Sequence, residues 1–469
     1  MTELRPDICV IGGGSAGLTV AAAASSFGHN VVLIERGKMG GDCLNYGCVP
    51  SKALIAAAKY AHAAREGAKF GINADPAVAF GKVHEHVHSV IDAIAPHDSV
   101  ERFEGLGVTV LKAHAMFVDG ETVDVEGTRV RAKRFVVATG SSPMLPPIPG
   151  LADCRPLTNE SVFDLTDLPR RLAVIGGGPI GAELSQAFAR LGSSVRVATD
   201  QTLLPADDPD AVEVVRKSLQ ADGVQIHERA AVTGASSHSN GLTLTLEGGG
   251  QLEADRVLVA AGRAPNVENL GLEKAGIAFD QRGIKVGADL RTSNRRIYAI
   301  GDVVGGLQFT HVAGHHASLA VRAIVFRMPV KYNADLMPRV TYTSPELAQV
   351  GLNAAAAQAR FGTAHVSMAP FARNDRAEAE GKTSGFVKLI MTPKGRLAGA
   401  TIVAPQAGEL IATYALALAA KVPVKTIASF TPAYPTFAET GKRAAINHFA
   451  AQLGAPWVKR VLGLLKRLP

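Results

Sequence analysis

The feature that most constrains the fold of this chain is a glycine-rich turn that occurs twice, each time between an apolar strand and a helix. The glycines are Gly12, Gly14 and Gly17 in the first copy and Gly176, Gly178 and Gly181 in the second. In a Gly-x-Gly-x-x-Gly turn the first glycine permits a tight bend, the second lets a pyrophosphate approach the backbone, and the third lets helix and strand pack closely. The motif alone is weak evidence, but the flanking elements make it strong. The sequence therefore predicts two dinucleotide-binding β-α-β units.

The elements around each turn support this prediction. The first unit runs from the apolar segment 8–11 to the segment 31–34 and ends at Glu35, whose carboxylate can accept hydrogen bonds from a ribose. In the second unit the corresponding segments are 172–175 and 195–197. Two dinucleotide sites indicate two different dinucleotides, most economically a flavin and a nicotinamide. The alternative is a decayed duplication, which the three intact glycines of the second copy disfavour.

Two of the four cysteines of the chain lie five positions apart, just after the first unit. Cys43 and Cys48 follow two glycines and precede a segment, 52–65, that is rich in alanine and predicts a helix. A cysteine near a helix N-terminus, four residues before Lys52, favours the thiolate. Such a pair beside a flavin can relay two electrons. The alternatives are a structural disulfide, or half of a zinc site, for which no second cysteine pair is present.

Composition excludes several other classes. The chain has 469 residues, of which 47% are hydrophobic, and this length suits about three domains. A net charge of +7 with 5% aromatic residues and no interleaving of basic and aromatic residues gives little support for nucleic-acid binding. No segment reaches the roughly 18 apolar residues of a membrane span. Residues 1–7 lead directly into a strand without the pattern of a signal peptide, so we expect a cytoplasmic protein.

The cysteine motif continues as Val49-Pro50-Ser51-Lys52, and with the two turns it resembles the pyridine nucleotide-disulfide oxidoreductases. This flavoenzyme family includes dihydrolipoyl dehydrogenase, glutathione reductase and mercuric reductase, and the resemblance covers essentially the whole chain. It implies that Cys48 is the charge-transfer thiol beside the flavin and that Cys43 attacks the substrate. Lys52 and Glu183 match an ion pair placed near the flavin. The last third of the chain resembles the dimerisation domain, so we expect a homodimer.

The resemblance also implies a set of cofactor-binding residues for FAD and a nicotinamide dinucleotide, among which Asp302 matches the acid on the flavin side of FAD. The full set is Gly12, Gly14, Ser15, Ala16, Gly17, Glu35, Arg36, Gly41, Asp42, Lys52, Ala115, Thr139, Gly140, Gly176, Gly178, Pro179, Ile180, Gly181, Glu183, Thr199, Asp200, Gly262, Arg263, Gly301 and Asp302.

The expected fold is α/β, with two doubly wound nucleotide-binding domains and a C-terminal α+β dimerisation domain. Proline-rich turns near residues 150 and 335 suggest the boundaries. The expected domains are an FAD-binding domain at 1–150 completed by about 285–335, an NAD(P)-binding domain at 151–284, an interface domain at 336–454 and a basic amphipathic helix at 455–469.

The sequence departs from its family near the C-terminus. Disulfide-reducing members carry His-Pro-Thr-x-x-Glu, whose histidine is the general acid/base, whereas this chain has Tyr434 before Pro435, with Glu439 in the last position. A phenol with a reference pKa of about 10 is a poor proton shuttle at neutral pH. The loss of a positioned acid/base typically costs about 10² to 10⁴ in rate, which argues against efficient turnover of lipoamide or glutathione. The histidines that could substitute are His311, His315, His316 and His448.

Mercuric reductases also carry tyrosine at this position, but they end in a further cysteine pair that this chain lacks. The functional expectation is a mercuric-reductase-like, FAD-dependent NAD(P)H oxidoreductase. It would pass electrons from NADH through the flavin to a redox disulfide of Cys43 and Cys48, and on to a thiol, disulfide or metal-ion acceptor. Dihydrolipoyl dehydrogenase is one alternative. An alternative of another class is a redox-sensing or electron-donor module for a membrane partner.

The second nucleotide site favours NADH over NADPH. Counting from the first glycine places Thr199 where the first unit has Glu35, and Asp200 follows it. No Arg or Lys lies between Arg196 and Arg216 to pair with a 2′-phosphate, whereas Asp200, Asp207 and Asp208 would repel it. Pro179 stands where the family often has a tyrosine that covers the nicotinamide pocket.

Two further segments carry weaker signals. In residues 84–88, His84 and His88 share one face of a helix and His86 points away, so we expect no metal site there. From Trp457 to Leu468 apolar residues share one helical face and basic residues the other, the profile of an interfacial helix at an anionic membrane or on a membrane partner. We favour the alternative, a terminal helix packed on its own dimer, because one short helix anchors weakly. Contact with the inner face of a membrane stays open.

Overall fold

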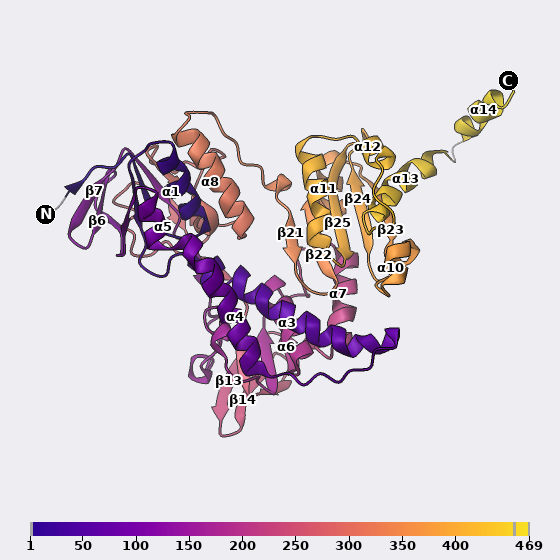
Figure 1. Cartoon of the computed structure of the whole chain (residues 1–469), viewed down its shortest axis with the longest axis horizontal. Coiled ribbons are helices and arrows are strands. Elements are labelled where there is room, and N and C mark those ends of the chain that lie inside the picture. Colours follow the sequence, from indigo (N-terminus) through magenta and orange to yellow (C-terminus); the bar gives the residue numbers. More distant parts are fainter. Residues whose placement is uncertain (1–2, 454–455, 468–469) are drawn as a thin grey trace. The chain divides into compact units, whose positions relative to one another are not determined.

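The computed structural model describes residues 3–453 and 456–467 of the chain. These form two compact units (Figure 1). The first comprises Met1–Gln201 and Gln225–Asn333, and the second comprises Thr202–Val224 and Ala334–Pro469. Each unit has its own sheets and hydrophobic core, and each is described by itself.

The first unit is organised around a five-stranded parallel sheet. Its strands are, in spatial order, β20 (Ile297–Ala299), β8 (Arg134–Val137), β2 (Ile8–Ile11), β3 (Val31–Ile34) and β4 (Val108–Leu111). Helices α1 (Ser15–Ser26) and α8 (Thr310–Ile324) pack side by side against one face, where Ile8 and Val10 lie in the core. Cys9 and Ile11 point to the opposite face, as the alternation of side chains along a strand requires.

That opposite face is covered by a small sheet of mainly antiparallel strands. Its strands are β1 (Glu3–Leu4), β7 (Thr128–Arg131), β6 (Thr122–Val125) and β5 (Met116–Phe117). Between β3 and β4 the chain forms a helical excursion that carries both cysteines of the predicted pair. Its helices are α2 (Gly41–Asn45), α3 (Cys48–Glu66), α4 (Phe80–Ile94) and α5 (Val100–Gly105), with the 3₁₀ turns η1 (Gly67–Phe70) and η2 (Ala95–Asp98). The helix expected at 52–65 therefore begins earlier, at Cys48.

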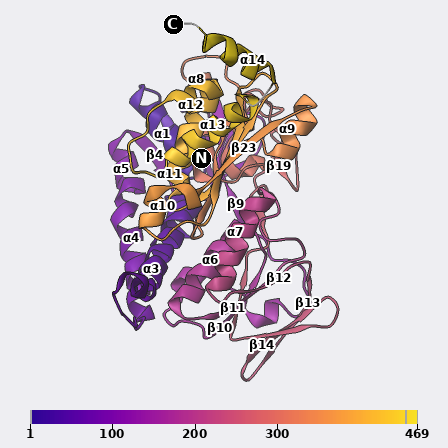
Figure 2. The same ribbon diagram turned by 90° about the vertical axis from the view of Figure 1, so that its right-hand side faces the viewer.

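A second parallel sheet in the same unit repeats the pattern. Its strands are, in spatial order, β12 (Gln225–His227), β11 (Ser194–Ala198), β10 (Arg171–Ile175) and β16 (Arg256–Val259). Helix α6 (Pro179–Leu191) packs on β10 and β11 and also contacts α3 (Figure 2). The three-stranded antiparallel sheet of β13 (Val232–His238), β14 (Gly241–Leu246) and β15 (Gln251–Ala254) shares a hydrophobic core with β10 and β16. Short ribbons pair β9 (Ser141–Pro143) with β17 (Arg263–Pro265) and β18 (Phe279–Asp280) with β19 (Gly283–Ile284).

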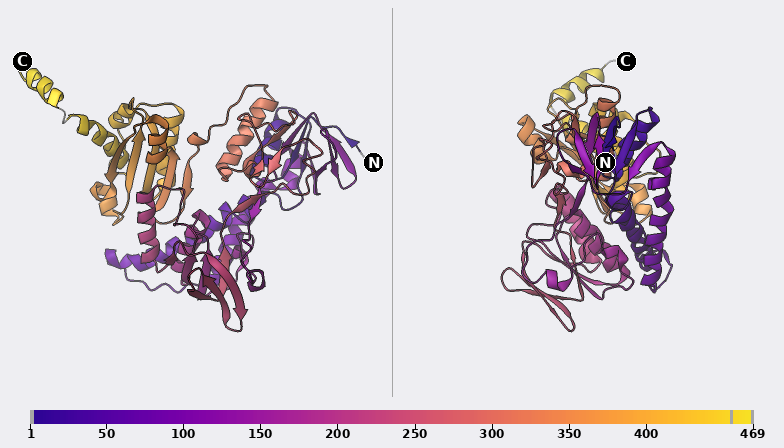
Figure 3. Two further views of the ribbon diagram at one scale, coloured as in Figure 1. Left: turned by 180° about the vertical axis from the view of Figure 1, so that it is seen from behind. Right: turned by 90° about the vertical axis from the view of Figure 1, so that its left-hand side faces the viewer.

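The second unit contains a five-stranded antiparallel sheet, seen from opposite sides in Figures 1 and 3. Its strands are β21 (Arg339–Thr341), β22 (Glu346–Gly351), β25 (Leu397–Ala404), β24 (Phe386–Met391) and β23 (His365–Pro370). The helices of the unit are α7 (Pro209–Ala221), α9 (Ala354–Phe361), α10 (Asp375–Ala379), α11 (Ala407–Ala419), α12 (Val424–Ser429), α13 (Glu439–Leu453) and α14 (Pro456–Leu465). Two parallel sheets with glycine turns in the first unit and an α+β second unit confirm the expected fold class.

Helix α7 belongs to the second unit although it lies between two strands of the second parallel sheet in the sequence. It packs against β22 and β25, and a buried charge cluster holds its first turn. The Lys388 side chain is only 8% exposed, and its Nζ lies 2.6 and 2.8 Å from the two carboxylate oxygens of Asp208 and 2.7 Å from Asp210 Oδ2. Burial disfavours the charge of Lys388, but the two carboxylates outweigh it, and its pKa is raised. This cluster explains why residues 202–224, which the sequence places with the second nucleotide-binding domain, pack here.

The Lys388 cluster makes a testable contribution to stability. Lys388→Met removes the ammonium and leaves the buried Asp208 carboxylate uncompensated, so we expect the free energy of unfolding to fall by about 3–5 kcal/mol. The matched control, Lys394→Met, removes an exposed lysine and is expected to change it by less than about 0.5 kcal/mol. Urea denaturation followed by circular dichroism measures both. Equal denaturation midpoints for the two variants would contradict the assignment, and Asp208→Asn in the Lys388→Met background is expected to recover part of the loss.

Candidate functional site

The first glycine turn has the geometry that a pyrophosphate requires. Gly12 adopts φ 111°, and a Cβ there would overlap the carbonyl oxygen of Ala138. A Cβ on Gly17 would overlap the carbonyl oxygen of Gly12, so α1 can begin beside β2 only without side chains at both positions. At Gly14, by contrast, the nearest atom to an added Cβ is Gly41 Cα at 3.8 Å. The backbone is therefore open to a ligand at the N-terminus of α1, where helix N–H groups favour an anion.

Acidic side chains flank this turn at the carboxyl ends of two strands. The Glu35 carboxylate accepts the N–H groups of Gly13 and Gly37, each at 2.5 Å, and so ties the end of β3 to the turn. Asp302 follows β20 and accepts the hydroxyl of Ser141 at 2.7 Å, and burial raises its pKa. These carboxylates lie at the edge of a parallel sheet where ligands of doubly wound folds bind. The residues fit a dinucleotide whose phosphates lie at the turn.

The second glycine turn repeats the same geometry. Gly176 has φ 116°, a Cβ on Gly181 would overlap the carbonyl oxygen of Gly176, and a Cβ on Gly178 would meet no atom within 4 Å. Pro179 is the first residue of α6, a position at which its missing N–H costs no helical hydrogen bond. Thr199 lies beside Gly177 as Glu35 lies beside Gly13. The correspondence of Thr199 and Glu35 counted along the sequence thus holds in space.

The two cysteines are free thiols with very different proton affinities. Cys43 lies in α2 and Cys48 is the first residue of α3. A hydrogen bond from Cys43, the Thr310 hydroxyl at 3.2 Å and the charge of Lys52 together outweigh burial and lower the pKa of Cys48 to about 6. The same hydrogen bond and burial raise the pKa of Cys43, although the hydroxyls of Thr310 and Ser15 lower it. At neutral pH the pair is therefore one thiolate and one thiol.

Charged residues hold the helices that carry the thiols. Lys52 Nζ lies 2.7 Å from Glu183 Oε2, and this ion pair joins α3 to α6. Asp42, which precedes Cys43, accepts Asn159 Nδ2 at 2.9 Å, and the guanidinium of Arg263 lies 3.1 Å from the same carboxylate oxygen.

Arg263 continues this network to the strand ends. It donates to the hydroxyl and carbonyl oxygens of Ser141 at 2.8 and 2.7 Å, and Ser141 in turn donates to Asp302. Among the residues of this network, the sequence did not identify Ser141, Asn159 or Thr310 as site residues. They carry no motif and come from distant segments, so no local pattern could have identified them.

The remaining predicted cofactor residues lie on the same loops and helix starts. Ser15 and Ala16 begin α1, Arg36 follows Glu35, and Ile180 is in the first turn of α6. The others lie at the sheet edges or beside the thiols, namely Gly41 at the start of α2, Ala115 after β4, Thr139 and Gly140 after β8, Asp200 after β11, Gly262 before β17 and Gly301 after β20.

The C-terminal residues Tyr434 and Glu439 make separate contacts in the second unit. Tyr434 is 71% exposed and donates its phenolic hydrogen to Asp375 Oδ2 at 2.9 Å. That carboxylate raises the pKa of Tyr434. Glu439 does not reach the phenol in these contacts; its Oε2 accepts the N–H of Thr436 at 3.0 Å, which caps the start of α13. The phenol is thus paired with an acid that the sequence did not identify.

The histidines weighed as substitutes differ in their environment. His316 is buried, accepts the N–H of Gly301 at its Nδ1, and burial lowers its pKa to about 4. Burial also lowers the pKa of His448. His311 directly follows Thr310, the residue that contacts Cys48. The ring centroids of His84 and His88 lie 4.3 Å apart on one face of α4, as expected for a helix. Within residues 3–453 and 456–467 no group of three or more potential ligands could hold a metal ion.

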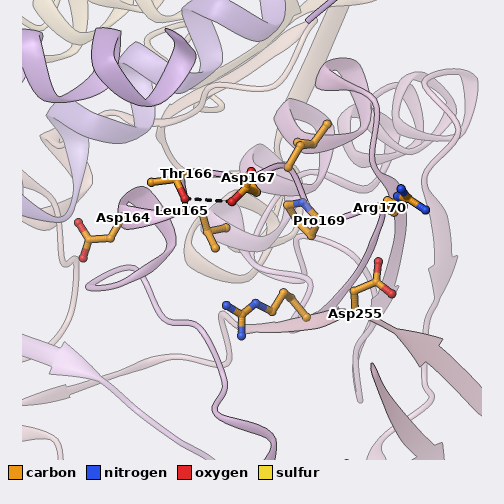
Figure 4. A pocket seen from close by; sticks show the side chains of 9 residues that line it. Asp164, Leu165, Thr166, Asp167, Pro169, Arg170 and Asp255 are labelled. Atoms are coloured by element: carbon orange, nitrogen blue, oxygen red, sulfur yellow. Dashed lines mark hydrogen bonds between the residues drawn. The ribbon is translucent and has the colours of Figure 1, made fainter. Parts of the chain in front are cut away.

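A hollow of about 410 Å³ lies elsewhere in the first unit, along the loop of residues 164–170 (Figure 4). Asp255 and Arg256 complete its lining, and the hydroxyl of Thr166 donates to Asp167 at 3.1 Å. It contains none of the predicted site residues.

Comparisons with known proteins cover both units. The family model for pyridine nucleotide-disulphide oxidoreductases matches residues 6–317, and the model for the dimerisation domain of the same enzymes matches 337–445. The chain is 38% identical over 455 residues to the mercuric reductase of Acidithiobacillus ferrooxidans, covering 93% of this chain and 82% of that protein. It is 35% identical over 454 residues to the dihydrolipoyl dehydrogenase of Geobacillus stearothermophilus, covering 94% and 96%.

Two solved structures illustrate the similarity of fold. LpdA from Mycobacterium tuberculosis has a TM-score of 0.87 at 28% identity, covering 97% of this chain and all of that one. The Cu(II) complex of the HOCl-induced flavoprotein disulfide reductase RclA from Escherichia coli has a TM-score of 0.85 at 26% identity, covering 94% of this chain and 99% of that one.

The asymmetry of the two thiols predicts a pH dependence of alkylation. Because the pKa of Cys48 is about 6, its thiolate fraction rises from about one tenth at pH 5 to about nine tenths at pH 7. We expect iodoacetamide to label Cys48 before Cys43 in the reduced protein, and the labelling rate of Cys48 to reach half its maximum near pH 6. Peptide mass spectrometry measures the labelling of each cysteine. Cys43→Ala and Thr310→Val each remove a hydrogen bond to the thiolate and are expected to raise the midpoint, Cys43→Ala more. Labelling of Cys43 first would contradict this assignment.

Proposed function

This chain belongs to the pyridine nucleotide-disulphide oxidoreductase family, whose members use FAD and a nicotinamide dinucleotide, and we propose that it reduces a thiophilic metal ion. In this proposal NADH is the reductant, bound FAD would supply the exchange of a hydride for an electron pair, and Cys43 and Cys48 hold the metal ion that accepts the electrons. The balance for mercury is NADH plus Hg²⁺ giving NAD⁺, H⁺ and Hg⁰, and for copper it is NADH plus two Cu²⁺ giving NAD⁺, H⁺ and two Cu⁺. The observation that most favours a metal ion as the acceptor is the hydrogen bond from Tyr434 to Asp375.

The thiols suit a soft cation. Thiolates are preferred ligands of soft metal ions, and ligand thiols must be deprotonated before they bind. Cys48 is already ionised at neutral pH, so binding needs only the proton of Cys43 to leave. Thr310 contacts both thiols and holds them at one position. Two adjacent thiolates would then clamp the ion while it is reduced.

The phenol of Tyr434 argues against a disulfide or dithiol acceptor. Such chemistry needs a group that can take up and return a proton near neutral pH. Tyr434 donates its hydrogen to Asp375, and the raised pKa keeps it protonated at neutral pH. A metal ion has no leaving thiolate to protonate, so it does not require this group. The dimerisation domain indicates a homodimer, and we propose that Tyr434 lies beside the thiols of the other subunit, where a proton shuttle would otherwise stand.

The relatives support both leading candidates. Proteins named mercuric reductase and a Cu(II)-bound reductase are among those similar to this chain, which favours a metal ion. Dihydrolipoyl dehydrogenases are similar as well, and they make dithiol oxidation the second candidate. One position favours this second candidate: His311 directly follows Thr310, whose hydroxyl contacts Cys48, and we propose it as the acid/base that would replace Tyr434 in dithiol chemistry.

We propose NADH as the preferred reductant. Only one of the three carboxylates that the sequence argument used still supports this preference. Asp208 is bound by Lys388 and Asp207 lies 3.8 Å from Arg339, so both carboxylates have partners in the second unit. Asp200 is exposed and follows Thr199 at the end of β11, so it is the acid that would meet a 2′-phosphate. Arg229 is a basic residue near this site in the backbone, since its main-chain N–H donates to the carbonyl oxygen of Gln201 at 3.0 Å.

The choice of acceptor can be tested with the purified holoenzyme. We expect Hg(II) or Cu(II) to accelerate anaerobic NADH oxidation more than lipoamide or oxidised glutathione does. Cys43→Ser is expected to lower the metal-dependent rate by at least about 10²-fold, because a hydroxyl does not replace a thiolate ligand. Cys154→Ser, at a buried cysteine outside the site, is the control and is expected to leave the rate within about twofold. Fastest oxidation with lipoamide in the parent enzyme would overturn the proposal.

The same panel run on Tyr434→His separates the two candidates. If the phenol is what limits dithiol chemistry, the imidazole restores a proton shuttle and lipoamide turnover rises by about 10-fold or more. An unchanged lipoamide rate together with an active parent enzyme would point to His311 as the acid/base instead.

The nucleotide preference rests on one charge. Asp200→Asn removes the carboxylate that would repel the 2′-phosphate, and we expect kcat/KM for NADPH to rise about 10-fold, which corresponds to roughly 1.4 kcal/mol, with little change for NADH. Steady-state kinetics with both nucleotides measure this. Arg229→Gln is the counterpart variant. A parent enzyme that prefers NADPH and loses this preference in Arg229→Gln would show that Arg229 dominates.

A further inference from the structure

The last helix of the chain has features that the proposed catalysis does not use. Residues 455–469 contain four basic residues and no acidic residue. At about 100° per residue, the apolar positions 458, 461, 462, 464 and 465 of α14 occupy an arc of about 160°. The basic residues fall outside that arc, and they are Lys459, Arg460, Lys466 and Arg467.

The apolar face of α14 lies open in the second unit. The exposed fractions of its large aliphatic side chains are 45% for Val461, 48% for Leu462, 64% for Leu464 and 53% for Leu465. The preceding helix α13 differs, because Ala444 and Ala445 are fully buried against the sheet. Figure 1 draws α14 beyond the end of α13 and away from that sheet. A contiguous exposed apolar face rimmed by charge marks an interaction surface.

We propose that α14 is an interfacial helix that lies on an anionic phospholipid surface, its apolar face in the acyl boundary and its cations at the lipid phosphates. A helix of ten residues is about 15 Å long, half the hydrocarbon thickness, so it can lie on a bilayer but not cross it. Consistently, no helix in the described part of the chain is long and apolar enough to span a membrane.

The charge of the segment and the presence of two copies in a homodimer favour an anionic lipid surface as the partner of α14. Each Lys or Arg near an anionic leaflet adds to the electrostatic attraction, and the four cations of this segment have no acid among them to offset it. Short amphipathic helices bind weakly one at a time. A homodimer carries two copies of α14, and binding of the first raises the effective concentration of the second. The surface therefore suits reversible, salt-sensitive attachment of the dimer, whatever acceptor the thiols reduce.

Vesicle sedimentation with the full-length holoenzyme tests the proposal. We expect vesicles of phosphatidylcholine and phosphatidylglycerol at 60:40 to pellet at least about tenfold more enzyme than pure phosphatidylcholine, and 0.5 M salt to abolish most of the difference. The variant K459Q/R460Q/K466Q is expected to lose this binding. The control K394Q/K421Q/K425Q removes three exposed lysines elsewhere in the second unit and is expected to retain it.

Each contrary outcome overturns the proposal. Equal pelleting with both vesicle types, or equal loss in both triple variants, would exclude specific attraction of α14 to anionic lipid. Gel filtration of the chain ending at residue 453 gives the remaining test. An unchanged elution volume with lost vesicle binding is expected, whereas a shift from dimer to monomer would assign α14 to the dimer interface. Metal-dependent NADH oxidation without vesicles is expected to be the same in the parent and both triple variants. Absence of this activity in the parent enzyme would overturn the acceptor proposal and would leave the vesicle result unaffected.

Discussion

Both nucleotide-binding halves of this protein depend on the close approach of a helix start to a strand end. In each half the third glycine of the turn lies against the carbonyl oxygen of the first, and the first lies against a carbonyl of a neighbouring strand end. A single methyl group at either position would push the helix away. With no such group, the N-termini of α1 and α6 reach the edges of their sheets. The second glycine leaves the space that a pyrophosphate can fill.

The redox pair depends on this arrangement through charged and polar side chains. Asp42 precedes Cys43, and the network through Arg263 and Ser141 joins it to Asp302 at the end of the parallel sheet. The loop that carries Cys43 and the carboxylate of Asp302 therefore belong to one connected group of hydrogen bonds and ion pairs. Within that group a shared hydrogen bond makes Cys48 acidic and keeps Cys43 protonated. At neutral pH Cys48 is therefore a thiolate, whereas Cys43 is a thiol that must lose its proton before it can act as a nucleophile.

The second unit contains a charge arrangement of a different kind. Lys388 is buried among carboxylates and fixes the first turn of α7 to a central part of the antiparallel sheet, whereas Tyr434 and Asp375 form an exposed pair. The buried cluster stabilises packing, and the exposed pair holds the phenolic proton of Tyr434 on a hydrogen bond to Asp375. A histidine at this position would titrate near neutral pH, whereas the carboxylate of Asp375 raises the pKa of the Tyr434 phenol. That difference in proton affinity is the physical basis for proposing a metal ion as the acceptor.

Much of the fold was determined by sequence patterns that act over short distances. The glycine turns, the apolar strands and the helix after the cysteines each follow from neighbouring residues, and together they specified the fold class and the family. The low pKa of Cys48 followed in direction from its place beside Lys52 and a helix start. The correspondence of Thr199 with Glu35, obtained by counting from the first glycine, also held in space because the two glycine turns share one geometry.

Other properties came only from the tertiary structure, because they depend on residues far apart in the chain. Nothing in the sequence pairs Tyr434 with Asp375 or leaves Glu439 to cap α13. The sequence also suggested that Asp207 and Asp208 face the nucleotide. In the second unit Arg339 lies near Asp207, and Lys388 pairs with Asp208. Local patterns determine where strands and helices begin and which cofactors they can hold. Long-range contacts decide which charges are neutralised and which side chains keep their protons, because they bring together residues that lie far apart in the sequence.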